Sequence, residues 1–191
     1  MAKAEQPVVF FVAPGDLEAW LEEHGETSDG IWLKFAKKAS GIRSVVYAEA
    51  VEIALCYGWI DGQVKRLDEE YYLQKFTPRR PRSKWSKINR EKAERLIAER
   101  RLRPAGLREV ERAREDGRWD EAYDSPTTAT VPDDFRVALD AEPAAREFFE
   151  SLGNTKRYSF LYRIRDARRP ETRAKRIAES VELLREGKTL T

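Results

Sequence analysis

Hydrophobic and polar residues alternate with a period of two in the first 78 residues. Ile31, Leu33 and Phe35 share one face of IWLKFAKK, which predicts a strand. PVVFFV, ended by a Pro-Gly pair, predicts a second short strand. WIDGQVKRL and YYLQKFT, joined by DEE, predict a hairpin. Gly62 inside its first strand indicates a bulge or a close approach of two backbones.

Two segments between these strands have the length and residue types of helices. DLEAWLEEHG carries apolar residues one turn apart, with Asp16 as the expected N-cap and Gly25 as the stop. YAEAVEIALCYG is apolar almost all round, which is typical of a buried helix. Gly58 stands where a left-handed glycine ends such a helix.

After Pro78 the periodicity becomes helical. Ser83 or Ser86 is the expected N-cap of the first of these helices, with Ile88, Leu96 and Ile97 facing inward. The predicted helices cover residues 86–101, 104–117, 133–143, 143–153, 155–169 and 170–187, with an exposed connector over 118–132. The last helix carries one apolar stripe, made of Ala174, Ile177, Ala178, Val181 and Leu184.

The pattern therefore predicts an α+β fold. A small mixed β-sheet with two helices occupies the N-terminal part, residues 1–78, and a mostly helical C-terminal part follows over residues 79–191. The joint at Pro78 to Arg82 is either a domain boundary or a crossover onto one shared core. We find no internal repeat.

Composition narrows the class of protein. The chain has 191 residues, of which 41% are hydrophobic and 37% charged, and it includes five tryptophans, as expected of a folded and heavily charged globular protein. No stretch of about 18 apolar residues exists, so no membrane insertion is expected. The N-terminal segment lacks the pattern of a signal peptide, which predicts a cytoplasmic protein.

Single copies of cysteine and histidine exclude several chemistries. Cys56 alone can form neither an internal disulfide nor a cysteine zinc cluster, and it is expected to be a buried, inert thiol. His24 alone removes most histidine-based catalysis and metal binding. We therefore expect no metal and no cofactor.

Basic residues cluster although the formal net charge is only +2. Residues 75–103 hold four Lys and eight Arg against three Glu, a local charge of +9. A second basic run covers residues 157–176. Such clustering suits an anionic ligand, a nucleic acid or an acidic protein as partner. The alternative is a solvated face on which the charges form ion pairs.

The stretch PRRPRSKWSKIN is the strongest candidate for a binding site. It combines a helix start, whose free N–H groups favour an anion, with arginine forks and a flat aromatic ring. The candidate residues for ligand or anion binding are Arg79, Arg80, Arg82, Ser83, Lys84, Trp85, Ser86, Lys87 and Asn89. In the alternative, the serines only cap, the tryptophan packs on the sheet and the arginines pair with nearby glutamates.

Trp59 and Asp61, in the motif WIDG, are candidates to support this site. Asp61 could act as a general base, with Trp59 as the wall of a pocket. The other interpretation, which we favour, is that Asp61 accepts hydrogen bonds from an arginine of the PRRPR loop or from backbone N–H groups, and so ties the sheet to the next helix. Trp20 and Trp32 are expected in the core.

Several stretches together resemble a known family. ALCYGWIDGQVKRLD, QKFTPRRPRSKWSKIN, ERLIAERRLRPAGL, GRWDEAYD and RRPETRAKRI occur in this order. They resemble the bacteriocin-protection, YdeI/OmpD-associated family of bacterial proteins, over about Gly30 to Lys188. The resemblance implies a link to envelope stress and to bacteriocin or peptide resistance, and it brings no established reaction. Relatives tend to carry Gly near Arg100 and Ser or Thr near Val46.

Two functions follow as hypotheses. The first is a non-enzymatic cytoplasmic protein that binds an anionic ligand or partner through the basic loop and helix start at residues 79–89. The second is an enzyme acting on a small molecule, with a pocket built on Trp59, Asp61 and the arginines of residues 79–82. The sequence contains no phosphate-cradling glycine loop and no Ser-His-Asp set, so we favour binding.

Overall fold

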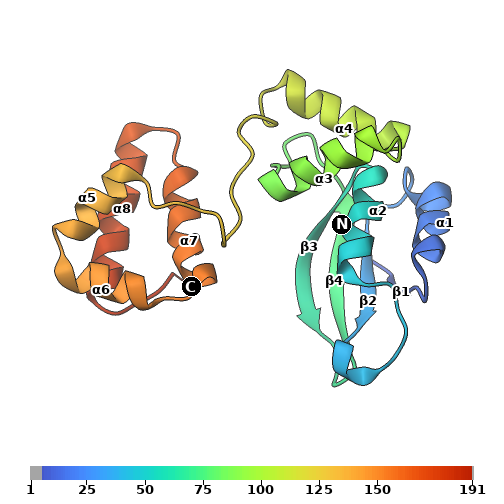
Figure 1. Ribbon diagram of the computed structural model, residues 1–191, viewed down its shortest axis with the longest axis horizontal. Coiled ribbons are helices and arrows are strands. Elements are labelled where there is room, and N and C mark those ends of the chain that lie inside the picture. The colour runs from blue at the N-terminus through green and yellow to red at the C-terminus, as the bar shows by residue number, and fades with distance from the viewer. Residues whose placement is uncertain (1–5, 191) are drawn as a thin grey trace, which may run out of the picture. The chain divides into compact units, whose positions relative to one another are not determined.

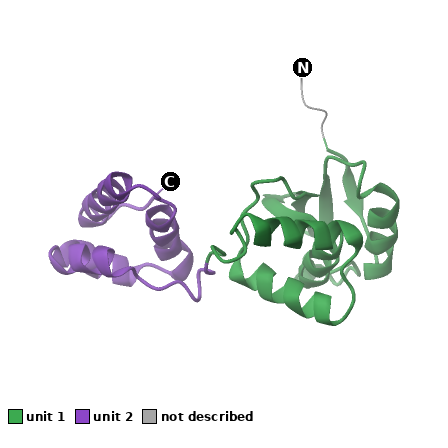
Figure 2. Cartoon of the chain, turned by 90° about the horizontal axis from the view of Figure 1, so that it is seen from above, with its two compact units in different colours: residues 1–123 green, residues 124–191 purple. Residues whose placement is uncertain are grey.

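The computed structural model describes residues 6–190 as two compact units. Unit 1 ends at Tyr123 and unit 2 begins at Asp124 (Figure 2). The division therefore falls after Tyr123 rather than after Pro78, because the two helices that follow the basic loop pack onto the core of unit 1. Residues 1–5 and residue 191 lie outside the described residues. Residues 1–5 begin the N-terminal segment in which the sequence shows no signal-peptide pattern.

Unit 1 is built on a four-stranded mixed sheet with the order β1-β2-β4-β3. Its strands are β1 (Val8–Phe10), β2 (Ile31–Ala36), β3 (Trp59–Arg66) and β4 (Tyr71–Pro78). β1 runs parallel to β2, and β4 is antiparallel to both β2 and β3. The hairpin and the bulge near Gly62 are confirmed, because the register of β3 against β4 shifts between Asp61 and Val64.

Helix α2 (Tyr47–Cys56) packs against β3 of this sheet, and α1 (Pro14–His24), α3 (Lys87–Ala98) and α4 (Pro104–Glu115) pack against α2 (Figure 1). A 3-10 turn, η1, lies at Lys38–Ser40. α2 is buried on most sides, as its apolar sequence predicts. Leu96 of α3 and Val110 of α4 are buried in the same core as the sheet. Ile88, expected to face inward, is instead exposed at the first turn of α3.

The prediction that Trp32, on strand β2, lies in the core is wrong. Ile31, Leu33 and Phe35 are buried, and the pleat turns Trp32 to the opposite face, where it is only partly buried. Trp32 is therefore not a core residue, although its apolar neighbours are.

The starts of α1 and α2 depend on an acidic residue in the first turn. Asp16 is not the N-cap of α1; Ala13 holds that position, and its N–H donates to the Asp16 side chain at 2.9 Å. At α2 the exposed Val46 is the N-cap, and its N–H donates to Glu49 at 3.1 Å. Valine has no side-chain oxygen, so half of a capping box is missing at α2.

Replacing Val46 by serine is expected to stabilise unit 1 by about 1 kcal/mol. The hydroxyl can accept from the N–H of Glu49 while the Glu49 carboxylate keeps its bond to residue 46. Urea unfolding followed by tryptophan fluorescence measures the change. Val46→Ala is the control, since it adds no acceptor and should give no such gain. Equal stability of the serine and alanine variants contradicts the prediction.

Unit 2 is helical throughout its regular structure. It consists of α5 (Asp133–Asp140), α6 (Pro143–Ser151), α7 (Asn154–Arg165) and α8 (Pro170–Arg185). Phe135, Phe160, Ile164 and Leu184 are fully buried in its separate core. With the mixed sheet of unit 1, these helices confirm the predicted α+β class, since half of the chain is helical and 15% is strand. Over residues 6–190, none of the helices has the length and apolar character that crossing a bilayer requires.

Candidate ligand-binding cleft

Four segments of unit 1 converge on a cleft of about 380 Å³. They are the end of α1, the joint between α2 and β3, the end of β4, and the first half of α4. The lining residues are Gly25, Glu26, Tyr57, Gly58, Trp59, Pro78, Arg79, Ala105, Arg108 and Glu109. The volume lies within the range of about 300–1,000 Å³ that small-molecule sites occupy.

Gly58 lets these segments meet. Its φ of +74° is left-handed, as predicted for the residue that ends α2. A Cβ at this position would lie 2.9 Å from the carbonyl oxygen of Ala105 and 3.1 Å from the Cγ of Glu109. The carbonyl of Gly58 accepts from the N–H of Arg79 at 2.9 Å. One glycine therefore allows α4 to approach the joint and anchors the end of β4 beside it.

Arg79 is a buried cation with unused hydrogen-bonding capacity. Its residue surface is only 6% exposed, and its guanidinium lies 3.6 Å from the ring centroid of Trp85. Nη1 donates to the carbonyl of Lys84 at 3.3 Å, but Nε and Nη2 have no acceptor. Burial lowers the pKa of Arg79 to about 10, and the nearby Glu109 carboxylate opposes that shift. The group stays charged at neutral pH, and an acceptor that reached it would relieve a costly unpaired charge.

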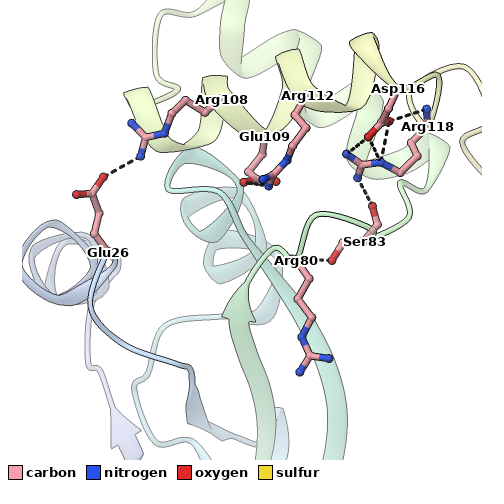
Figure 3. Close-up of polar contacts among 8 residues, drawn as sticks. All are labelled: Glu26, Arg80, Ser83, Arg108, Glu109, Arg112, Asp116 and Arg118. Carbon is pink, nitrogen blue, oxygen red and sulfur yellow. Dashed lines mark hydrogen bonds and ion pairs between the residues drawn. The ribbon is translucent and has the colours of Figure 1, made fainter.

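Glu109 supplies the opposite charge in the same cleft. One carboxylate oxygen pairs with Arg112, one helical turn along α4 (Figure 3). The other oxygen, Oε2, is buried and has no partner. Glu109 and Arg79 form no ion pair with one another. The cleft thus presents one donor group and one acceptor group that the described residues leave unsatisfied.

Arg108 and Glu26 form the rim of the cleft. The Nη2 of Arg108 lies 2.8 Å from the Oε1 of Glu26, which joins α4 to the segment after α1 (Figure 3). Both side chains are more than half exposed, so this pair contributes little to stability. A weak surface ion pair can open at low cost to admit a ligand.

Trp59 forms the back wall. Its ring is 1% exposed, it meets the Trp20 ring edge-on at 5.9 Å, and its Nε1 donates to the carbonyl of Gly25 at 3.0 Å. The indole is thereby fixed by packing and by a hydrogen bond. Trp59 thereby fixes the joint between α2 and β3 that lines the cleft beside Arg79.

Asp61 does not take part in this cleft. It accepts a hydrogen bond from the hydroxyl of Tyr47, the first residue of α2, at 2.7 Å. Burial, and next this hydrogen bond, raise the pKa of Tyr47. The expected contact between Asp61 and an arginine of the PRRPR loop is not formed, so Asp61 ties β3 to α2 instead.

The other residues of the basic loop either point into solvent or hold the loop in its turn. Arg80 and Arg82 are exposed, and the Arg80 guanidinium points away from α4 (Figure 3). Ser83 turns the loop by accepting from the N–H of Arg80 at 2.9 Å, and its carbonyl accepts from Arg118 at 2.7 Å. Lys84 is exposed and Lys87 half-buried. Only Arg79 of this loop lines the cleft.

The N-terminus of α3 is largely satisfied by the protein itself. The Ser86 hydroxyl accepts from the N–H of Asn89 at 3.2 Å, which makes Ser86 the N-cap. The N–H of Lys87 donates to the carbonyl of Tyr123 at 2.8 Å. Trp85 is buried between Arg79 and Trp119. The N–H groups of Lys87 and Asn89 are therefore not free for an anion, which fits the alternative in which the serine only caps the helix.

Sequence reasoning missed the contribution of α4. Arg108 and Glu109 look like residues of a solvated helix face, since charged neighbours spaced by three or four are common there. The one available signal was Gly106 inside the helix, because a glycine in such a position often marks a close approach. A Cβ there would lie 2.4 Å from the carbonyl oxygen of Cys56.

Cys56 and His24 offer no nucleophile–base pair. Burial raises the pKa of Cys56 to about 11, so the thiol is protonated at neutral pH. His24 stacks on Trp20 with a centroid distance of 5.0 Å. Residues 6–190 contain no group of three or more His, Cys, Asp or Glu side chains that could hold a metal ion.

A second cleft, of about 660 Å³, lies in unit 2 between α5 and α8. Small and aliphatic residues line it, among them Ala138, Ala174, Ile177, Ala178 and Val181. The apolar stripe predicted on the last helix is thus only partly covered: Leu184 is buried, whereas Ala174 and Ala178 are exposed. An ion pair between Arg173 and Asp134, at 2.6 Å, lies at this cleft.

Comparison with known families assigns each unit separately. Residues 9–109 match a model described as a domain of unknown function (DUF8412), which covers just over half of the chain. Residues 128–187 match the model of the family described as bacteriocin-protection, YdeI or OmpD-associated. No curated protein and no solved structure matches the chain.

The second match confirms the family expected from the sequence, over a shorter segment than Gly30 to Lys188. Most of the stretches that carried the resemblance, including the motif around Trp59, lie instead in the region of the DUF8412 model. The candidate cleft belongs to that region, and the cleft between α5 and α8 belongs to the other. The chain therefore belongs to the DUF8412 family through unit 1, and its residues 128–187 form a domain of the bacteriocin-protection, YdeI or OmpD-associated family.

Proposed function

We propose that this chain is a non-enzymatic binding protein that holds a small anionic or zwitterionic molecule in the cleft of unit 1, with Arg79 as the anchor. The observation that carries the proposal is the Arg79 guanidinium, which is 6% exposed and has two nitrogens without acceptors. Such a group is costly unless a partner meets it, and a carboxylate or phosphate matches the arginine fork.

Glu109 narrows the ligand class. Its unpartnered Oε2 can accept a hydrogen bond from an amine or amide of the same ligand. A molecule with a carboxylate or phosphate for Arg79 and an N–H group for Glu109 satisfies both. Amino acids, short peptides and amino phosphates have this chemistry.

A protective role against bacteriocins in the cytoplasm is part of the proposal. The match of residues 128–187 to the bacteriocin-protection family supports the protective role. The basic loop at residues 79–89 gives the surface beside the cleft a positive charge, and its exposed Arg80 and Arg82 can attract an anion.

The alternative of an enzyme is supported less well. Of the residues on which it was built, Trp59 and Arg79 line the cleft, whereas Asp61, its general base, is bonded to Tyr47. A general base must reach the proton that it removes. Binding without chemistry is the simpler use of this cleft.

Ligand-dependent stabilisation tests the proposal. We expect a melting-temperature screen of amino acids, dipeptides and phosphorylated amines to identify a ligand, because a compound at 100 times its Kd adds roughly 2.7 kcal/mol to stability. Arg79→Lys keeps the charge but loses the fork and should weaken binding at least about tenfold. Arg136→Lys, the same change at an exposed arginine of unit 2, is the matched control and should bind normally.

Two results would overturn the proposal. One is a screen in which no compound of these classes shifts the melting temperature. The other is a shift that Arg79→Lys leaves intact. A ligand that is consumed during incubation would favour the enzyme instead.

A further inference from the structure

The outer face of the unit 1 sheet, opposite the helices, carries aromatic rings on three neighbouring strands, with Phe10 exposed and Trp32 and Tyr71 half-buried. Phe10 lies on β1, Trp32 on β2 and Tyr71 on β4. The register places them on one face, because Phe10 pairs with Lys34 of β2 and Tyr71 pairs with Ala36, both in the same alternation as Trp32. Phe10 is 38% exposed, and the rings of Phe10 and Tyr71 meet edge-on at 6.0 Å.

Three lysines of the same face surround these rings. The Nζ of Lys34 lies 3.7 Å from the centroid of Tyr71 and 5.7 Å from that of Phe10. Lys65 and Lys75 place their Nζ atoms 4.9 Å and 5.6 Å from the centroid of Trp32. No outer-face position of the four described strands holds an aspartate or a glutamate, so the face is uniformly positive.

This combination of side chains is informative. Lysines on a sheet usually pair with acidic neighbours on the next strand, and aromatic rings are usually buried away from water. Here the cations have no carboxylates across the strands and lie on ring faces instead. Flat rings for stacking, interleaved with cations along adjacent strands, are what a single-stranded nucleic acid requires.

We propose that this face binds single-stranded nucleic acid, with Trp32 and the Phe10–Tyr71 pair stacking on bases. When a base takes the ring face, the flexible side chains of Lys34, Lys65 and Lys75 can swing to the phosphates. A duplex fits poorly, since its bases are already stacked on one another and present no free face to an aromatic ring. None of these six residues lines the cleft of unit 1, so this surface is separate from the proposed function.

Fluorescence anisotropy with labelled 20-mers of dT and of U tests the proposal on the full chain. We expect binding that weakens steeply with salt, and a duplex of the same length that competes poorly. Changing Lys34, Lys65 and Lys75 together to glutamine should lower the slope of log affinity against log salt by about 2. Trp32→Leu should weaken binding by roughly tenfold or more.

Two controls separate this surface from general charge and from misfolding. Lys156, Lys175 and Lys188 are exposed lysines of unit 2, and changing these three to glutamine removes the same charge while leaving affinity largely unchanged. Trp32→Phe keeps a stacking ring, so it should retain most of the affinity, provided that circular dichroism shows each variant folded.

The proposal is overturned if no binding occurs at low salt, or if a duplex competes as well as a single strand. It is also overturned if both lysine triples reduce affinity equally, since that result indicates non-specific attraction. A self-association of the chain that Trp32→Leu abolishes would assign the face to a second copy of the protein instead.

Discussion

Replacing Gly106 by alanine is expected to destabilise unit 1 by about 3 kcal/mol or more. The added Cβ would lie 2.4 Å from the carbonyl oxygen of Cys56 and 2.7 Å from that of Leu55. Both are backbone atoms of the last turn of α2, so no side chain can rotate away. The N–H of Arg103 also donates to the Cys56 carbonyl at 3.0 Å, which holds the two helices together. The clash of the added Cβ with these carbonyl oxygens can therefore be removed only if α4 moves away from α2.

Urea unfolding followed by tryptophan fluorescence measures this effect in unit 1 alone. All five tryptophans lie at positions 20 to 119, before the boundary at Tyr123. Gly15→Ala is the matched control, because Gly15 is also helical but a Cβ there meets nothing within 4 Å. That variant should be neutral or slightly stabilised, by up to about 1 kcal/mol. A Gly106→Ala protein within 1 kcal/mol of the parent would show that the helices can separate freely.

The α+β class was predictable because periodicity is a local property. Alternation marked the strands, and glycine and proline marked most helix ends. The composition of PRRPRSK is that of a linker and could not decide between the two alternatives at this joint. The crossover onto one shared core fits the structure, since the helices after the joint bury Leu96 and Val110 in the core of the sheet. Arg100 has a φ of +57°, a left-handed conformation that favours glycine, at the turn between α3 and α4.

The candidate site was predictable only in part, for geometric reasons. Trp59 and Arg79 meet because β3 and β4 are paired, and Trp59 lies opposite Pro78. Asp61 was misplaced because a strand advances about 3.3 Å per residue, which carries it along β3 to Tyr47. Glu109 comes from a helix that the sequence could not place. Trp32 was assigned to the core because it is large and apolar, although the alternation that places Ile31, Leu33 and Phe35 on one face places Trp32 on the other.

Replacing Trp59 by alanine is expected to cost unit 1 about 3–5 kcal/mol, as for other buried aromatic residues. The indole is 1% exposed, so its removal leaves a cavity behind the cleft and also takes away the donor that satisfies the Gly25 carbonyl. Trp59→Phe keeps most of the ring volume and should lose mainly the hydrogen bond, about 1 kcal/mol plus a smaller packing loss.

Urea unfolding followed by far-ultraviolet circular dichroism measures the Trp59 variants, since the signal does not depend on the number of tryptophans. Trp32→Ala is the matched control, because it removes an equal ring from the outer face, where partial exposure makes the loss smaller. If Trp59→Ala and Trp32→Ala cost the same, Trp59 is not the fixed wall described above. If Trp59→Phe folds but no longer binds a ligand that the parent binds, the indole contacts the ligand directly. Retained binding would show that Trp59 acts by holding Arg79 in place.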